Sequence, residues 1–114
     1  MNIITSTTTD KKKLYQMTKG ANVKRIQDNE GKTITVKNYV LYEETKNTGD
    51  IVAVLCVEDQ DGGLYASNSP TFRESFLDIS HICGDNPVDM IGEDVRIEAG
   101  TSKAGRKFFT CVWA

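Results

Sequence analysis

The sequence has few of the residues from which catalytic and metal sites are usually built. It contains one histidine, His81, and three cysteines that lie far apart and form no C-x-x-C pair. Zinc sites need paired cysteine and histidine ligands, and no such pairs are present. No serine lies in a nucleophile-elbow sequence, and no glycine-rich segment has the P-loop spacing. We therefore predict a protein that is not an enzyme and needs no cofactor, metal ion or small-molecule substrate.

Long apolar segments are also missing. The longest apolar run, Ile51–Val57, is far shorter than the roughly 20 residues of a membrane-spanning helix. The N-terminus lacks the basic start and apolar stretch of a signal peptide. We therefore expect a cytoplasmic protein without membrane contact. In that compartment Cys56, Cys83 and Cys111, each among apolar neighbours, are expected to be buried free thiols.

The net charge of −2 on 114 residues argues against a nucleic-acid partner, but the distribution of the charges argues for one. Residues 1–42 carry a net charge of +5, residues 43–98 carry −10 and residues 99–114 carry +3. Such asymmetry is typical of a basic face on an acidic body. The alternative is that two solvated basic ends flank an acidic middle. The length fits a single domain.

Turn signals and hydrophobic periods divide the chain into short elements. Residues 1–9 are interpreted as a frayed tail or an edge strand, and Asp10–Lys19 as a helix with Thr9 or Asp10 as its N-cap. A second helix is predicted to begin at Ser69-Pro70. Five strands are predicted, at Thr33–Glu44, Ile51–Glu58, Leu64–Asn68, Asp94–Ala99 and Arg106–Trp113.

The order of these elements predicts a mainly β protein with the OB-fold. Three strands, a helix and two further strands are the topology of this five-stranded, partly open Greek-key barrel, which binds oligonucleotides. The helix lies between the third and fourth strands. We divide the chain into an N-terminal extension, residues 1–30, with a tail and a short helix, and an OB-fold domain, residues 31–114. The strand Thr33–Glu44 is apolar on both faces, as expected of a barrel strand that bends or changes its partner.

The segment Gly100–Phe109 carries the strongest functional signal. Glycines permit close approach of the backbone to a ligand, and Thr101, Ser102 and Lys103 can donate hydrogen bonds to phosphate oxygens. In an OB-fold the loop Gly100–Gly105 would join the fourth and fifth strands and border the ligand. An ordinary hairpin loop with a tolerated lysine is the alternative interpretation.

Aromatic residues supply candidate surfaces on which bases could stack. We predict that Tyr39 shares the polar face of the first strand with Lys37, and that Tyr65 projects from the third strand. Phe108 and Phe109 point to opposite faces, and Phe108 is expected to be the exposed one because Phe109 belongs to the more apolar parity. For each tyrosine, packing in the barrel with a solvated hydroxyl is an equally good interpretation.

The predicted DNA-binding set combines these aromatics with basic and hydroxyl side chains near the loop and near the turn before the first strand. It consists of Lys24, Arg25, Lys32, Lys37, Tyr39, Tyr65, Arg96, Thr101, Ser102, Lys103, Arg106, Lys107 and Phe108.

With these residues in view, the chain resembles the small single-stranded DNA-binding proteins of tailed phages and related mobile elements of Gram-positive bacteria. It is similar in particular to those that serve protein-primed phage DNA replication. The matching segments are Asp61–Ala66, the helix that follows, and Gly100–Phe109, and the likeness covers residues 30–114. The resemblance implies an OB-fold protein that coats single strands without sequence preference in the bacterial host cell, with replication proteins as further candidate partners. The alternative is an OB-fold module that presents Tyr39 and Tyr65 to a host protein and binds or inhibits it.

Overall fold

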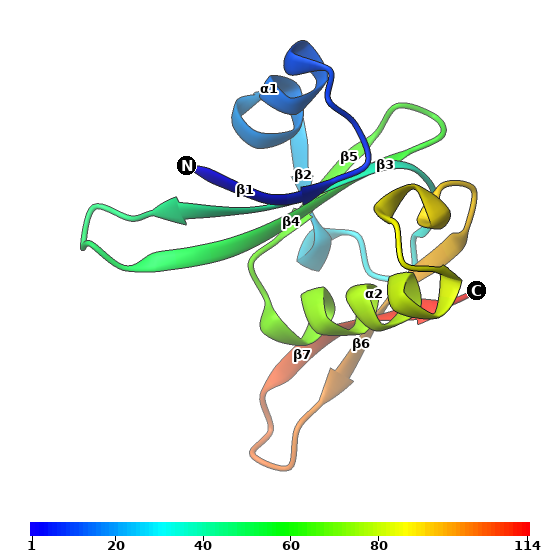
Figure 1. The fold of residues 1–114 in the computed structure, drawn as a ribbon. Helices are drawn as coiled ribbons and strands as arrows, with labels where there is room; N and C mark the ends of the chain where they lie inside the picture. Colours follow the sequence, from blue (N-terminus) through cyan, green and yellow to red (C-terminus); the bar gives the residue numbers. More distant parts are fainter.

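A curled, mostly antiparallel β-sheet forms the body of the protein, with two helices packed against it (Figure 1). The computed structural model describes all residues from 1 to 114. The helices are α1 (Lys11–Lys19) and α2 (Pro70–Cys83), and two short 3-10 turns are η1 (Ile26–Asp28) and η2 (Pro87–Met90). The strands are β1 (Asn2–Ser6), β2 (Val23–Arg25), β3 (Thr33–Thr45), β4 (Ile51–Asp59), β5 (Leu64–Ser67), β6 (Asp94–Thr101) and β7 (Lys107–Trp113).

The prediction of a mainly β protein is confirmed, but the sheet has seven strands where the sequence predicted five. The additional strands are β1, which pairs with β3, and β2, which has only three residues and pairs in parallel with β5. Three residues are too few to show an alternating apolar pattern in the sequence, so β2 forms a strand because it pairs with β5. The remaining strands follow the order β5-β4-β3-β6-β7, and α2 connects β5 to β6.

The long strand β3 changes its partner partway, as its two apolar faces predicted. Thr33–Thr35 pair with β6, whereas Val36–Thr45 pair with β4. A β-bulge between Val36 and Asn38 marks the change. A bulge bends the strand and inserts one residue, so the side chains that follow it exchange faces. This bend curls the sheet around the core.

The outer strands of the curled sheet are β2 and β7. At one edge β2 lines β5, and η1 follows it with Ile26 almost fully buried. At the other edge α2 lies along β7, where the backbone N–H of Cys111 donates a 2.8 Å hydrogen bond to the Ser75 hydroxyl. The strands β5 and β7 do not pair with each other, so the curl stays open. Covering an edge satisfies its backbone groups and blocks unwanted strand pairing.

Two apolar clusters lie on opposite faces of the sheet. The main core, inside the curl, contains 15 buried residues, among them Tyr39 and Phe76, whose rings meet edge to face at 5.0 Å. The second cluster has five buried residues on the outer face, where Met17 of α1 packs against β3, β4 and β5. Met17 and Ile26 belong to residues 1–30, so this segment contributes to both clusters, and the domain boundary at residue 30 stays a prediction.

The helices begin at good capping residues. Asp10 is the N-cap of α1 and accepts hydrogen bonds from the backbone of Lys12 and Lys13. Ser69 caps α2, and Pro70 follows at its first position, as predicted. Neither helix has the length and apolar character needed to cross a membrane.

The three cysteines are free, as predicted, but they differ in burial. Cys56 and Cys111 are buried, and desolvation raises the pKa of each thiol to about 12. Cys83 is only half-buried, so the expectation of full burial is wrong for this residue. It lies at the last turn of α2, with its sulfur 3.9 Å from that of Met90.

Candidate nucleic-acid interface

The β6–β7 hairpin projects from the body and carries most of the predicted binding residues (Figure 1). Its strands pair in register out to Thr101 and Lys107. Gly100 and Thr101 therefore belong to β6 rather than to the loop, and the connecting loop is residues 102–106. Every residue from 101 to 108 is exposed. Gly105 has a φ of +80°, which favours glycine at this turn.

Hydrogen bonds within the loop hold its shape and direct its cations outward. The N–H of Ser102 donates to the carbonyl of Arg106 at 2.8 Å, and the N–H of Arg106 donates to the Ser102 hydroxyl at 3.1 Å. The Ser102 hydroxyl keeps its own proton for another acceptor. Lys103 and Arg106 form no ion pair, so their charges are available to a phosphate.

The ring of Phe108 packs against a glycine on the paired strand. It lies opposite Gly100, and a Cβ built at Gly100 would be 2.5 Å from Cζ of the ring. The Phe108 side chain is 37% exposed, whereas Phe109 packs against the main core. The predicted orientations of the two phenylalanines are thus confirmed. An exposed ring beside free cations is the arrangement that stacking and phosphate contacts require.

Two other cations of the predicted set are paired with carboxylates. The ammonium of Lys107 lies 2.9 Å from the Glu30 carboxylate, and the guanidinium of Arg96 lies 3.0 Å from that of Glu98. The Lys107 and Glu30 side chains are 61% and 52% exposed and those of Arg96 and Glu98 are 43% exposed, and solvent-exposed pairs contribute only about 0–1 kcal/mol. A phosphate can therefore compete with either carboxylate for its cation.

A shallow trough runs beside β6 and reaches Gly105 and Lys107 at the end near the loop. It consists of two adjoining hollows of about 390 and 260 Å3 that share Glu30 and Ala99. Gly31 and Lys32 bond to the backbone of Ile97, but no strand continues the pairing beyond it. By the alternation of a strand, the backbone groups of Ala99 and Thr101 face this free edge. They add neutral hydrogen-bonding groups next to Lys107 and the loop.

A comparison with sequence models of protein families identifies the family of the whole chain. The sequence model of the phi29-type family described as "Phage Single-stranded DNA-binding protein" matches residues 2–112 of the chain. The chain belongs to this family. It is therefore a single-stranded DNA-binding protein, and the resemblance carried by Gly100–Phe109 is confirmed. The match also includes the N-terminal segment, which the likeness over residues 30–114 left out. Searches of curated proteins and of solved structures found no match.

In this phage single-stranded DNA-binding protein, Tyr39 does not share the polar face of β3 with Lys37. Tyr39 is 2% exposed, packs on Phe76 and shares a 3.3 Å hydrogen bond with the buried Ser80 hydroxyl. The prediction failed because the bulge after Val36 moves Tyr39 to the core face. Its ring offers no face to a base.

Tyr65 is also buried, at 3% exposure, although its position on the third predicted strand is correct. Both faces of β5 are covered: Leu64 packs in the outer cluster and Tyr65 in the main core. The ammonium of Lys24, on the neighbouring β2, lies 5.3 Å from the centre of the Tyr65 ring. Tyr65 therefore positions a cation and does not itself present a stacking surface.

The basic residues before β3 fall into different surroundings. Lys24 forms no ion pair, whereas Lys32 pairs with Asp59 and Asp61 at 3.3 and 3.7 Å. The hydrogen bond to Asp59 holds the pKa of the Lys32 ammonium above its ordinary value. Arg25 lies 3.9 Å from Asp28 and is exposed. Of these residues, Lys24 has the charge most available to a ligand.

Lys37 stands apart from the hairpin. It lies exposed in the bulge of β3, where its charge helps to lower the pKa of Glu58. Glu58 is buried and accepts hydrogen bonds from Lys13 at 2.7 Å and Asn38 at 3.0 Å. No contact in the structure connects Lys37 to the β6–β7 hairpin, so the predicted set does not form one continuous patch.

Sequence reasoning missed two features of the hairpin. Glu30 is not in the predicted set, yet its carboxylate pairs with Lys107 and borders both hollows of the trough. Gly100 was interpreted as a flexible loop residue, yet it lies in β6 under the Phe108 ring. A glycine directly across a hairpin from an exposed aromatic residue is a signal that could have revealed the second feature.

Proposed function

We propose that this protein coats single-stranded DNA without sequence preference during the replication of phage or mobile-element DNA in a bacterial cytoplasm. The observation that carries the proposal is the β6–β7 hairpin, where the exposed ring of Phe108 accompanies the unpaired charges of Lys103 and Arg106. Phosphate contacts and stacking on ring faces carry little sequence information. Binding of this kind suits a protein that must cover any single strand.

We infer that the curled sheet is an OB-fold. In support, β3, β4 and β5 form an antiparallel meander, β3 also pairs with β6, and β6 pairs with β7. The helix α2 connects β5 to β6, and the curl remains open between β5 and β7. A partly open barrel with these pairings matches the OB-fold, in which the loop between the last two strands borders the ligand. Here that loop is residues 102–106.

A non-enzymatic role is part of the proposal, since the family binds DNA and is not one of enzymes. Replication proteins are the further partners that such a role implies. The alternative, a module that binds or inhibits a host protein, rested on Tyr39 and Tyr65 as displayed residues. Both rings are buried, so the alternative has lost the residues that supported it.

The test is fluorescence anisotropy with a labelled oligo-dT at two salt concentrations and an unlabelled duplex of equal length as competitor. The proposal expects salt-sensitive binding that the duplex does not displace and that other single-stranded sequences do displace. Equal competition by duplex, or binding limited to one sequence, would contradict a general coating role. A reconstituted strand-displacement reaction then tests replication: addition of the protein should increase the length of the product.

A further inference from the structure

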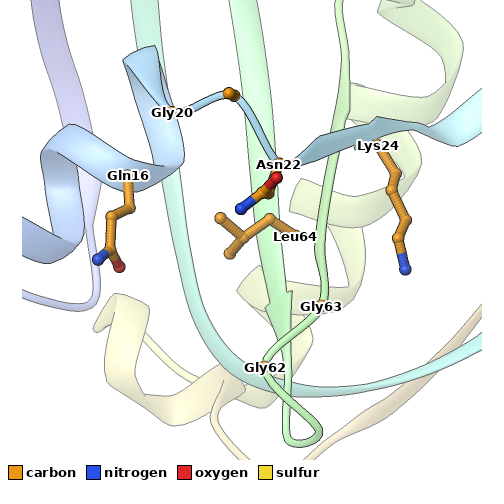
Figure 2. A pocket seen from close by; sticks show the side chains of 8 residues that line it. Gln16, Gly20, Asn22, Lys24, Gly62, Gly63 and Leu64 are labelled. Atoms are coloured by element: carbon orange, nitrogen blue, oxygen red, sulfur yellow. The ribbon is translucent and has the colours of Figure 1, made fainter.

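A second polar hollow lies at the opposite end of the sheet from the β6–β7 hairpin, between the end of α1 and the tip of the β4–β5 hairpin (Figure 2). With a volume of about 480 Å3, it lies in the range of small-molecule sites, whose cavities measure roughly 300–1,000 Å3. Its lining consists of Gln16, Gly20, Ala21, Asn22, Lys24, Gly62, Gly63 and Leu64. None of these residues is acidic, although residues 43–98, which include β4 and β5, carry a net charge of −10.

None of the three polar side chains that line the hollow forms a hydrogen bond or an ion pair within the protein, and Lys24 contacts only the Tyr65 ring. The side-chain amides of Gln16 and Asn22 form no hydrogen bond, and the ammonium of Lys24 forms no ion pair. The nearby carboxylate of Asp61 is already engaged by the N–H of Gly63 at 2.8 Å and by Lys32. The hollow therefore presents two amides without hydrogen-bond partners and one ammonium without an ion pair, and the charge of that ammonium helps to lower the pKa of the nearby Asp61 carboxyl.

The shape of the hollow suits an extended chain lying across it. Figure 2 shows Gln16 and Asn22 on the Leu64 side of the Gly62–Gly63 segment and Lys24 on its other side. The glycines carry no side chain, and a Cβ at Gly62 would project into open space. Leu64 lines the hollow with the small part of its side chain that the outer cluster leaves exposed. One ligand lying over the glycines could thus reach an apolar surface, amide donors and acceptors, and a positive charge.

A nucleotide has the groups that match this lining. Its base has an apolar face and an edge of donors and acceptors, which free amides can satisfy, and its phosphate suits an ammonium. We propose that this hollow binds one nucleotide of the bound DNA strand, with the base over Leu64 beside Asn22 and Gln16, and the phosphate at Lys24. The inference rests on the proposed function and adds a second contact site to it.

Contacts within the protein connect the regions of the two sites. Lys24 lies over Tyr65, and the site of a Cβ on Gly63 is 3.2 Å from the Tyr65 hydroxyl. Lys32, paired with Asp61 on the same hairpin tip, bonds through its carbonyl to the N–H of Ile97, where the trough begins. In the proposed path, a DNA strand held by the β6–β7 hairpin continues past Lys32 to the hollow.

The experiment compares wild type, N22A/K24A and K11A in anisotropy titrations with oligo-dT of increasing length. Lys11 is exposed, unpaired and not part of the hollow, so K11A removes the same charge elsewhere. We expect N22A/K24A to keep the affinity of wild type for the shortest oligonucleotide that binds. For longer oligonucleotides it should lose affinity by on the order of tenfold, with a salt slope smaller by about 0.7. The K11A variant should follow wild type at every length.

A second measurement needs no variant. In amide NMR spectra of the wild type, a long oligo-dT should shift the side-chain signals of Gln16 and Asn22 and the backbone signals of Gly62 and Gly63, and the shortest should not. Suppose that wild type binds oligo-dT, that N22A/K24A has the affinity of K11A at all lengths, and that these NMR signals do not shift. The hollow is then not a binding site, and the proposed function stands. If wild type binds no single strand, the proposed function fails together with the inference.

Discussion

Phe108 and Gly100 face each other across the β6–β7 hairpin, and the Phe108 ring fills the space that a side chain at Gly100 would need. The glycine thus sets the position of the ring, and the ring, exposed on its other side, is placed next to the loop with Lys103 and Arg106. The relationship connects a backbone position in β6 to the stacking surface that we propose for DNA.

Replacement of Phe108 by alanine should weaken binding of oligo-dT by about 1–3 kcal/mol, the range for loss of one stacked base. The G100A variant should weaken it in the same direction, because the new methyl group would displace the ring. The double variant should be little worse than F108A, since both changes act on one contact. Anisotropy titrations measure all three, and circular dichroism checks the fold. Wild-type affinity in G100A would show that the ring position does not matter.

Removal of the two free loop cations should change the salt dependence of binding. In K103A/R106A the slope of log affinity against log salt should fall in magnitude by about 1.4, since each phosphate contact on a single strand contributes about 0.7. The K11A variant is the matched control for loss of a surface charge. An unchanged slope in the double variant would place the loop outside the path of the strand.

Neutralisation of Glu30 should strengthen binding. Its carboxylate holds Lys107 at 2.9 Å and borders the trough, so E30Q frees a cation and removes a repulsion from phosphate. Because the exposed pair contributes about 0–1 kcal/mol, the gain in affinity at low salt should be at most about fivefold for the freed cation. E74Q, on the exposed surface of α2, removes the same charge without breaking an ion pair. Weaker binding by E30Q than by E74Q would mean that Glu30 holds the hairpin in its active shape.

The orientation of side chains could be predicted from the sequence where the alternation of apolar residues continues without interruption along a strand. The apolar parity of β7 runs from Phe109 through Cys111, so Phe108 was correctly expected to be exposed. In β3 the parity count failed at Tyr39, because the two apolar faces indicate a change of strand partner but not the residue at which the bulge lies. The family resemblance, in contrast, rested on Asp61–Ala66, the helix that follows and Gly100–Phe109, and it needed no assignment of strand faces.

Tertiary pairing was the part that the sequence did not reveal. Lys107 meets Glu30 across 77 positions of the chain, and nothing local to either residue indicates the contact. The same holds for β2, whose three residues form a strand only because β5 lies beside them. The hollow of Gln16, Asn22 and Lys24 depends on that pairing and on the docking of α1, so it too becomes visible only in the folded chain.

The buried ion pair between Lys13 and Glu58 should make the stability of the protein depend on pH. Burial alone would raise the pKa of the Glu58 carboxyl, but hydrogen bonds from Lys13 and Asn38 outweigh it and hold the pKa below its ordinary value of 4.5. A carboxyl whose pKa is lower in the folded state stabilises the fold above the unfolded pKa. That contribution is lost as the pH falls through the folded pKa.

In urea unfolding at pH 7, E58Q should therefore be less stable than wild type. Breaking a fully buried pair costs about 3–5 kcal/mol, and we expect less here because the Lys13 side chain is 27% exposed. Between pH 5 and the lower limit of folding, wild type should lose more stability than E58Q, because only wild type protonates this group. E43Q, whose glutamate lies on the same strand pair but is partly exposed and forms no ion pair, should keep the pH dependence of wild type. Parallel pH profiles for E58Q and wild type would show that the Lys13–Glu58 pair does not anchor α1 to the sheet through its charge.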